Sequence, residues 1–88
     1  APKRKYGYFL LPLLHKGSLV GRMDAKAWRN EKRLQIIKLY LEPGVKPNKM
    51  LAKDLAVTIK AYAAWQGLEK VHVDWTDPAE FRELLQFN

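Results

Sequence analysis

The chain has 88 residues, of which 48% are hydrophobic and 28% are charged. This length fits one domain with a single core, and this composition excludes a disordered or low-complexity segment. The absence of cysteine excludes disulfides, thiolate metal sites and cysteine nucleophiles. The longest apolar run, residues 8–14, is far shorter than the roughly 20 residues that a membrane span requires. We therefore expect a cytoplasmic domain without a membrane contact.

Positive charge is concentrated in the first two thirds of the chain. Sixteen Lys and Arg residues against nine Asp and Glu residues give a net charge of +7. Residues 1–60 carry fourteen basic and four acidic side chains, a net +10, whereas residues 61–88 carry two basic and five acidic ones, a net −3. A basic body of this kind favours a polyanionic partner, and nucleic acid is the first candidate. The alternative is a basic protein whose charge serves only its solubility.

The N-terminal half of the chain predicts an antiparallel meander of three strands. Residues 8–15 are typical of a largely buried strand, and Pro12 within them favours a sheet edge or a bulge. Gly17 can adopt the positive φ of a tight hairpin turn, which leads into a return strand over residues 19–28. After a short polar turn, a third strand is expected over residues 34–42.

Strict alternation along these strands assigns each side chain to one face of the sheet. In the second strand, one face would carry Leu19, Gly21, Met23, Ala25 and Ala27. The other face would carry Val20, Arg22, Asp24, Lys26 and Trp28. In the third strand, the residues expected to share one face are Gln35, Ile37, Leu39 and Leu41. Because three alternating charges are unfavourable in a core, the face with the charges is expected to be exposed or to line a contact surface.

The C-terminal half predicts a long helix, a short strand and a second helix. Asn48 is a suitable N-cap and Gly67 suits the position after the helix end, so the long helix is expected over residues 48–66. Residues 71–75 predict a strand, and residues 77–80 open a second helix with a capping-box-like start and Pro at N1.

These elements form one domain of residues 6–88, preceded by a linker stub of residues 1–5. The predicted fold class is α+β, a small curved antiparallel sheet or partial β-barrel (β-β-β-α-β-α) packed on one long helix.

Catalytic and metal sites have little support in the sequence. None of the hydroxyl residues lies in a Gly-x-Ser-x-Gly elbow, and no glycine-rich loop could cradle a phosphate. His72 and Asp74 point to one face of a strand, but two ligands without a third are weak support for a metal site. No catalytic residue, metal or cofactor is therefore expected, and this chain by itself is not expected to be an enzyme.

The charged face of the second strand is the first candidate for nucleic-acid contacts. Arg22, Lys26 and Trp28 share this face, and Arg22 is expected to form a fixed ion pair with Asp24. The adjoining turns contribute further candidates, His15, Lys16 and Arg29. The alternative is an ordinary solvated sheet face with a weak ion pair.

A second basic row is predicted on the outer side of the long helix. Lys49, Lys53 and Lys60 lie within about 40° of one another at 100° per residue, opposite the apolar stripe. Lys49 and Lys53 repel each other at i,i+4 by roughly 0.2–0.5 kcal/mol, and a contact with phosphates would offset this repulsion. The alternative is a lysine row that serves solubility alone.

The stretch YGYFLLPLLHKGSLVGRMDAKAWRNEKRLQIIKLYLEPGV, residues 6–45, carries a resemblance to a known family. It combines an aromatic-Gly-aromatic start, Leu-Pro-x-Leu, a Gly hairpin and Val-Gly-Arg-x-Asp-x-Lys-x-x-Arg, followed by Leu-Glu-Pro-Gly-Val. With the helix that follows and the turn Gly67-Leu68-Glu69-Lys70-Val71, the chain resembles the C-terminal domain of the winged-helix DNA glycosylases, the AlkZ/YcaQ-like family. The resemblance covers about residues 6–73.

The resemblance implies a bacterial DNA-repair protein that hydrolyses the N-glycosidic bond of alkylated purines, including interstrand crosslinks. Such proteins grip DNA with tandem winged helices and a small C-terminal β-barrel, and this chain is similar to the barrel alone. The family's catalytic Gln-x-Gln or Gln-x-Asp motif lies in the winged-helix part. The glutamines here do not match it, because they stand in Gln35-Ile36-Ile37, Gln66-Gly67-Leu68 and Gln86-Phe87-Asn88.

We therefore expect an accessory domain that contributes DNA grip and structural support but no bond-breaking chemistry. The expected partners are duplex DNA, through its backbone phosphates, and the winged-helix domains of the same parent chain, on which the acidic last helix would dock. A protein-interaction or purely structural module with incidental positive charge is the alternative. An RNA-binding module is disfavoured, because sheet-based RNA readers need exposed aromatics on central strands and Trp28 is the only good candidate.

Overall fold

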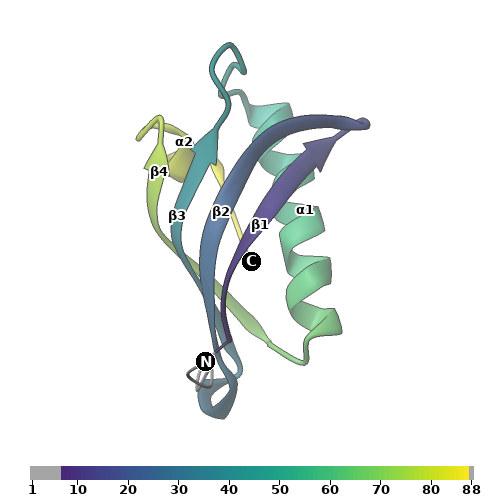
Figure 1. The fold of residues 1–88 in the computed structure, drawn as a ribbon, viewed down its shortest axis with the longest axis vertical. Coiled ribbons are helices and arrows are strands. Elements are labelled where there is room, and N and C mark those ends of the chain that lie inside the picture. Colours follow the sequence, from purple (N-terminus) through teal and green to yellow (C-terminus); the bar gives the residue numbers. More distant parts are fainter. Residues whose placement is uncertain (1–6, 88) are drawn as a thin grey trace, which may run out of the picture.

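A computed structural model describes residues 7–87 of the chain (Figure 1). Side chains are described from Leu10 onward. The predicted linker stub, residues 1–5, lies outside the described residues. The predicted antiparallel meander is confirmed, and its strands are β1 (Gly7–His15), β2 (Ser18–Trp28) and β3 (Arg33–Leu41).

The turn between β1 and β2 is a tight hairpin. His15 pairs with Ser18, so only Lys16 and Gly17 form the loop. Their φ angles are 54° and 81°. Positive φ at both loop residues matches the right-handed twist of the flanking strands, and glycine adopts this conformation without strain.

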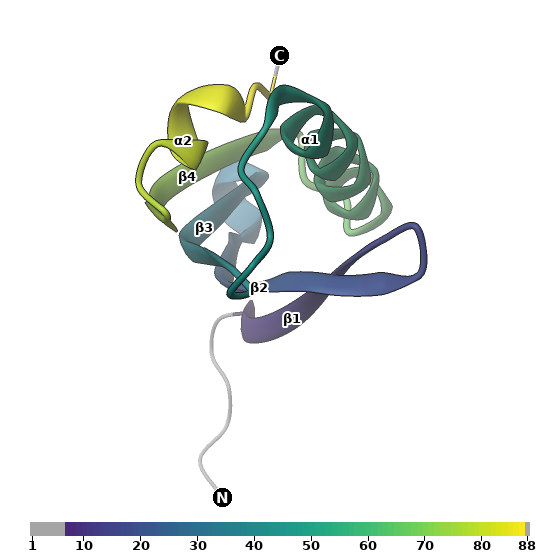
Figure 2. The same ribbon diagram turned by 90° about the horizontal axis from the view of Figure 1, so that it is seen from above.

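The fourth strand, β4 (Lys70–Asp77), pairs with β3 in parallel, so the sheet is mixed and has the order β1-β2-β3-β4. The prediction of an antiparallel sheet is therefore wrong for β4. The helix α1 (Lys49–Trp65) connects β3 to β4 and returns the chain to the starting end of β3, so the next strand runs parallel. The sheet stays open, with β1 and β4 at its edges, and curves around α1 (Figure 1 and Figure 2).

Both predicted ends of α1 are confirmed. At the start, the side chain of Asn48 accepts a hydrogen bond from the backbone N–H of Leu51 at 2.8 Å. At the end, Gly67 has a φ of 80°, and the N–H of Leu68 donates to the carbonyl of Ala63 at 2.8 Å. Within residues 7–87, no helix has the length and apolar character that a membrane crossing needs.

A β-bulge near the hairpin changes which residues of β2 are buried. Leu13 pairs with Gly21 and Leu14 pairs with Leu19, so Val20 is the extra residue. Val20 is 7% exposed and Leu19 is 52% exposed, the reverse of the burial expected from strict alternation. The bulge shifts the phase of the strand at this point, whereas the rest of β2 alternates as predicted.

A second bulge corrects the predicted faces of β3. Asp24 pairs with Lys38 and Ala25 pairs with Ile36, which leaves Ile37 as the extra residue relative to β2. The prediction that Gln35 shares a face with the buried Leu39 is wrong, because the bulge shifts the alternation by one residue. The buried residues of β3 are Leu34, Ile36 and Leu39.

The second helix, α2 (Phe81–Leu84), is shorter than predicted and begins at Phe81 rather than at Pro78. The hydroxyl of the buried Thr76 lies 2.7 Å from the carbonyl oxygen of Pro78 and 3.1 Å from that of Ala79. These side-chain hydrogen bonds hold residues 78–80 in a turn and replace the predicted capping box.

The two helices lie on the concave side of the sheet (Figure 2), and the core fills the space between them and the sheet. Its most deeply buried large side chains are Met23, Leu34, Ile36, Leu39, Leu55, Ile59 and Phe81. Gly21 allows β2 and β3 to approach closely, because a Cβ at this position would collide with the carbonyl oxygen of Tyr40. Among the described residues, no helix covers the opposite, convex side of the sheet (Figure 2).

Candidate nucleic-acid interface

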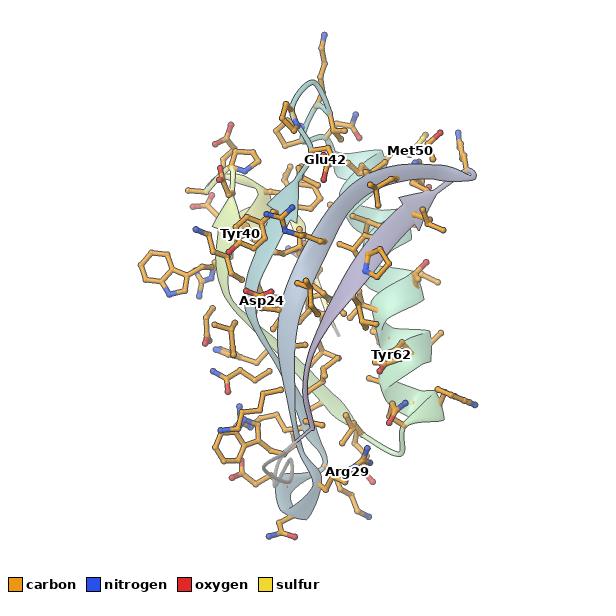
Figure 3. The ribbon with its side chains drawn as sticks, in the orientation of Figure 1. Asp24, Arg29, Tyr40, Glu42, Met50 and Tyr62 are labelled. Atoms are coloured by element: carbon orange, nitrogen blue, oxygen red, sulfur yellow. The ribbon has the colours of Figure 1, made fainter. Side chains whose placement is uncertain are left out.

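The convex side of the sheet, called the outer face below, collects charged and aromatic side chains of two central strands. The contributions of β2 are Arg22, Asp24, Lys26 and Trp28, and those of β3 are Arg33, Gln35, Lys38 and Tyr40. Figure 3 shows Asp24 and Tyr40 on the side of the sheet away from α1, which carries Tyr62. The structure thus brings three predicted candidates, Arg22, Lys26 and Trp28, onto one surface.

Two cations lie over the ring of Tyr40. The guanidinium carbon of Arg22 is 4.7 Å from the centre of this ring, and the ammonium nitrogen of Lys38 is 4.9 Å from it. Both distances fall within the ~6 Å range of cation–π attraction. Arg22 and Tyr40 are register partners on β2 and β3, so the strand pairing itself places the guanidinium beside the ring.

The ring of Trp28 holds a second pair of cations and is fixed by a hydrogen bond. The ammonium nitrogen of Lys26 is 4.1 Å from the ring centre, and the guanidinium carbon of Arg33 is 5.2 Å from it. The indole N–H of Trp28 donates to Oε1 of Gln35 at 2.8 Å. The hydrogen bond holds the indole in one orientation, and the ring in turn orients two positive charges.

A chain of hydrogen bonds continues from Gln35 into β4. Its amide nitrogen donates to Oδ2 of Asp74 at 2.6 Å, and Oδ1 of Asp74 lies 3.0 Å from Nε2 of His72. The chain Trp28–Gln35–Asp74–His72 therefore links three strands on the outer face. Residues 7–87 contain no group of three or more side chains arranged to hold a metal ion.

The predicted ion pair between Arg22 and Asp24 is not formed. The ion pairs among the described residues are His15–Asp54, Lys32–Glu69, Arg33–Glu31 and His72–Asp74. Tyr40 lies directly across the ladder from Arg22, whereas Asp24 is two residues away on the same strand, at about 7 Å between Cα atoms. The guanidinium therefore stacks on the ring.

Two predicted candidates hold the sheet against α1. Nε2 of His15 lies 2.7 Å from Oδ2 of Asp54, a residue of α1. Arg29, at the start of the short 3₁₀ helix η1 (Arg29–Glu31), donates to the carbonyl and the side-chain oxygen of Gln66 at 3.0 and 2.9 Å. Lys16 is exposed at the hairpin. A contact of these three residues with nucleic acid stays a prediction.

The lysine row of α1 lies on the other side of the molecule. Lys49, Lys53 and Lys60 are exposed on the helix, which covers the concave side of the sheet. The two predicted basic rows are therefore separated by both layers of the fold. One straight segment of nucleic acid cannot contact them together.

Sequence reasoning missed the residues that β3 contributes to the outer face, which are Arg33, Gln35, Lys38 and Tyr40. Strict alternation in β3 fails at the bulge at Ile37. For this reason it does not predict that the polar residues before and after Ile37 lie on the same face. The signal in the sequence is the spacing of Gln35 and Lys38, which are three residues apart instead of two. Such a spacing between polar residues of one strand indicates a bulge between them.

No family model and no solved structure matches the chain. The resemblance to the winged-helix DNA glycosylases therefore stays a sequence-based hypothesis. The chemistry of the outer face follows from its own side chains, which are cations able to bind anionic oxygens and rings that hold those cations in place.

Proposed function

We propose that the chain is a non-catalytic module that binds nucleic acid through the outer face of its sheet. The observation that supports this proposal is the placement of two cations over each of two rings on one surface. A cation–π contact at an exposed site contributes about 0.5–1 kcal/mol. A hydrogen bond to a charged group contributes about 1.5–3 kcal/mol. A phosphate can therefore draw these cations from the rings.

The family resemblance supplies the biological setting of the proposal. The chain would be the C-terminal accessory domain of a bacterial winged-helix DNA-repair glycosylase that acts on alkylation damage and interstrand crosslinks. Duplex DNA would be bound through its backbone phosphates, without sequence preference. The bond-breaking residues would lie in the winged-helix domains of the parent chain, and the acidic segment of residues 61–88 would dock on those domains.

The salt dependence of duplex binding tests the proposal. We expect the variant Arg22→Gln/Lys38→Gln to lower the slope of log K against log salt by about 1.8, because two phosphate contacts are lost. The matched control, Lys49→Gln/Lys53→Gln, removes the same charge from α1 and should leave the slope unchanged. A slope that responds only to the α1 variant contradicts the proposal, as does the absence of binding to both duplex and single-stranded DNA at low salt.

A protein-interaction module is the second candidate function, and exposed apolar side chains favour it. Leu10, Leu14 and Leu19 are 59%, 58% and 52% exposed on the β1–β2 hairpin, and Leu14 and Leu19 are register partners. Exposed apolar side chains that lie side by side, as Leu14 and Leu19 do, are typical of contact sites. If this hairpin binds the winged-helix domains, Leu14→Ser/Leu19→Ser should abolish that association and leave DNA binding unchanged. If the variant still associates with the winged-helix domains, the hairpin is excluded as their binding site.

A further inference from the structure

Trp75 adds a third ring to the outer face. It is 68% exposed, and its register partner is Lys38, which lies over the ring of Tyr40 on the same face. Tyr40 itself pairs with Asp77, so the two rings stand on neighbouring strands with an offset of two residues, about 7 Å along the strands. Among the described residues, no cation lies over the ring of Trp75.

Aromatic rings beside cations suit unpaired bases better than a duplex. An unpaired base can stack on an aromatic side chain while its phosphate binds a neighbouring cation. In a duplex the base faces are covered by their neighbours, and opening the stack costs free energy. A duplex can therefore use the cations of the outer face but not its rings.

The shape of the outer face also disfavours reading a duplex groove. The major groove is about 12 Å wide and admits a helix or a two-stranded ribbon. Four strands about 4.8 Å apart span roughly 14 Å before side chains are added, and α1 lies on the opposite side of the sheet. The sheet is too broad to enter the groove.

We propose that the outer face binds an unpaired nucleic-acid strand, with bases stacked on Trp75 and Tyr40 and a further base at Trp28. This inference rests on the proposed function and names the form of nucleic acid that the face prefers. Four-stranded sheets that bind single strands stack two or three bases, which agrees with the number of rings here.

The cations give a route by which a base reaches the Tyr40 ring. Arg22 and Lys38 lie over this ring in the free protein. A base that stacks on the ring displaces one of them, and the displaced cation then pairs with the phosphate of the same strand. Trp75 needs no such displacement, so its ring is the first contact and the one whose removal weakens binding most.

Fluorescence anisotropy with two labelled probes tests this inference. The probes are an oligothymidylate of about twelve nucleotides, which covers the site of a small domain, and a duplex of the same length. We expect the oligothymidylate to bind more tightly than the duplex. Trp75→Ala should weaken its binding about tenfold, the loss of one stacked base, and should change duplex binding less than about twofold.

Two further variants separate stacking from loss of fold. Trp65→Ala removes a ring that is 79% exposed on α1, and it should leave both affinities unchanged. Trp75→Phe keeps a ring and should retain most of the affinity, while the quenching of tryptophan fluorescence by the oligothymidylate decreases. Circular dichroism checks that each variant is folded.

The outcomes distinguish this inference from the function on which it rests. Equal binding of both probes, with no response to Trp75→Ala or Tyr40→Ala but weaker binding after Arg22→Gln/Lys38→Gln, overturns the preference for unpaired strands and leaves the binding face intact. If neither the oligothymidylate nor the duplex binds at low salt, both the inference and the proposed function are overturned. If Trp75→Ala lowers the affinity for the oligothymidylate about tenfold and leaves that for the duplex unchanged, both the inference and the proposed function are supported.

Discussion

The two faces of the same sheet are built from different kinds of contact. On the concave face, Met23, Leu34 and Leu39 are at most 1% exposed, and they pack against the helices. On the outer face, charged groups lie over rings, and a hydrogen-bonded chain crosses three strands without a covering layer among the described residues. The first face accounts for folding by burial of apolar area.

The cation–π contacts of the outer face and the exposed ring of Trp75 contribute little to folding. Cation–π contacts at exposed positions are weak, and an exposed tryptophan gains nothing from the core. The concave face thus accounts for the fold, and the contacts of the outer face are the basis of the binding site that we propose.

A pair of aromatic substitutions contrasts the two faces. Phe81→Ala removes a ring that is 0% exposed and should lower the free energy of unfolding by about 3–5 kcal/mol. Trp75→Ala should change it by less than about 0.5 kcal/mol, because the ring is exposed. Urea denaturation measures both. A comparable loss in the two variants would show that Trp75 is part of the fold.

Gly21→Ala should lower the free energy of unfolding by about 2–3 kcal/mol, because the added Cβ meets the carbonyl oxygen of Tyr40 and forces β2 away from β3. Ser18→Ala, at an exposed position of the same strand, is the control and should have little effect. Thermal unfolding of both variants tests this. Unchanged stability of Gly21→Ala would mean that β2 and β3 can move apart to accommodate the added Cβ without a loss of stability.

Gln35→Leu should cost about 1–2 kcal/mol, because it leaves the indole N–H of Trp28 and the carboxylate of Asp74 without their partner on β3. Gln86→Leu, at an exposed position, serves as the control. Guanidinium unfolding of the two variants is compared. Equal effects would exclude a structural role for the hydrogen-bonded chain.

A double-mutant cycle between Arg22 and Tyr40 should give a coupling of about 0.5–1 kcal/mol. The matching cycle between Arg22 and Asp24 should give a coupling close to zero, because these two residues form no ion pair. Stronger coupling to Asp24 than to Tyr40 would reverse the assignment of the guanidinium partner.

Local signals in the sequence predicted much of the fold. The cap at Asn48, the left-handed residue Gly67 and the hairpin glycine Gly17 each act within a few residues, so their effects are visible in the sequence. The bulge residues Val20 and Ile37 were not predicted, because the register between strands depends on packing across the whole sheet.

The candidate site could be predicted only in part for the same reason. Arg22, Lys26 and Trp28 lie on one strand, and alternation alone groups them. Tyr40 and Trp75 join them only through pairing with other strands, and no local pattern carries that register. Counting Trp28 as the only suitable ring therefore underestimated the aromatic character of the outer face.

The indole N–H signals of Trp28, Trp65 and Trp75 in a two-dimensional NMR spectrum report which surface meets nucleic acid. Trp28 and Trp75 belong to the outer face, whereas Trp65 lies at the end of α1. On titration with an oligothymidylate we expect the signals of Trp75 and Trp28 to move and that of Trp65 to stay in place. Movement of the Trp65 signal alone, or of none of the three, would contradict binding by the outer face.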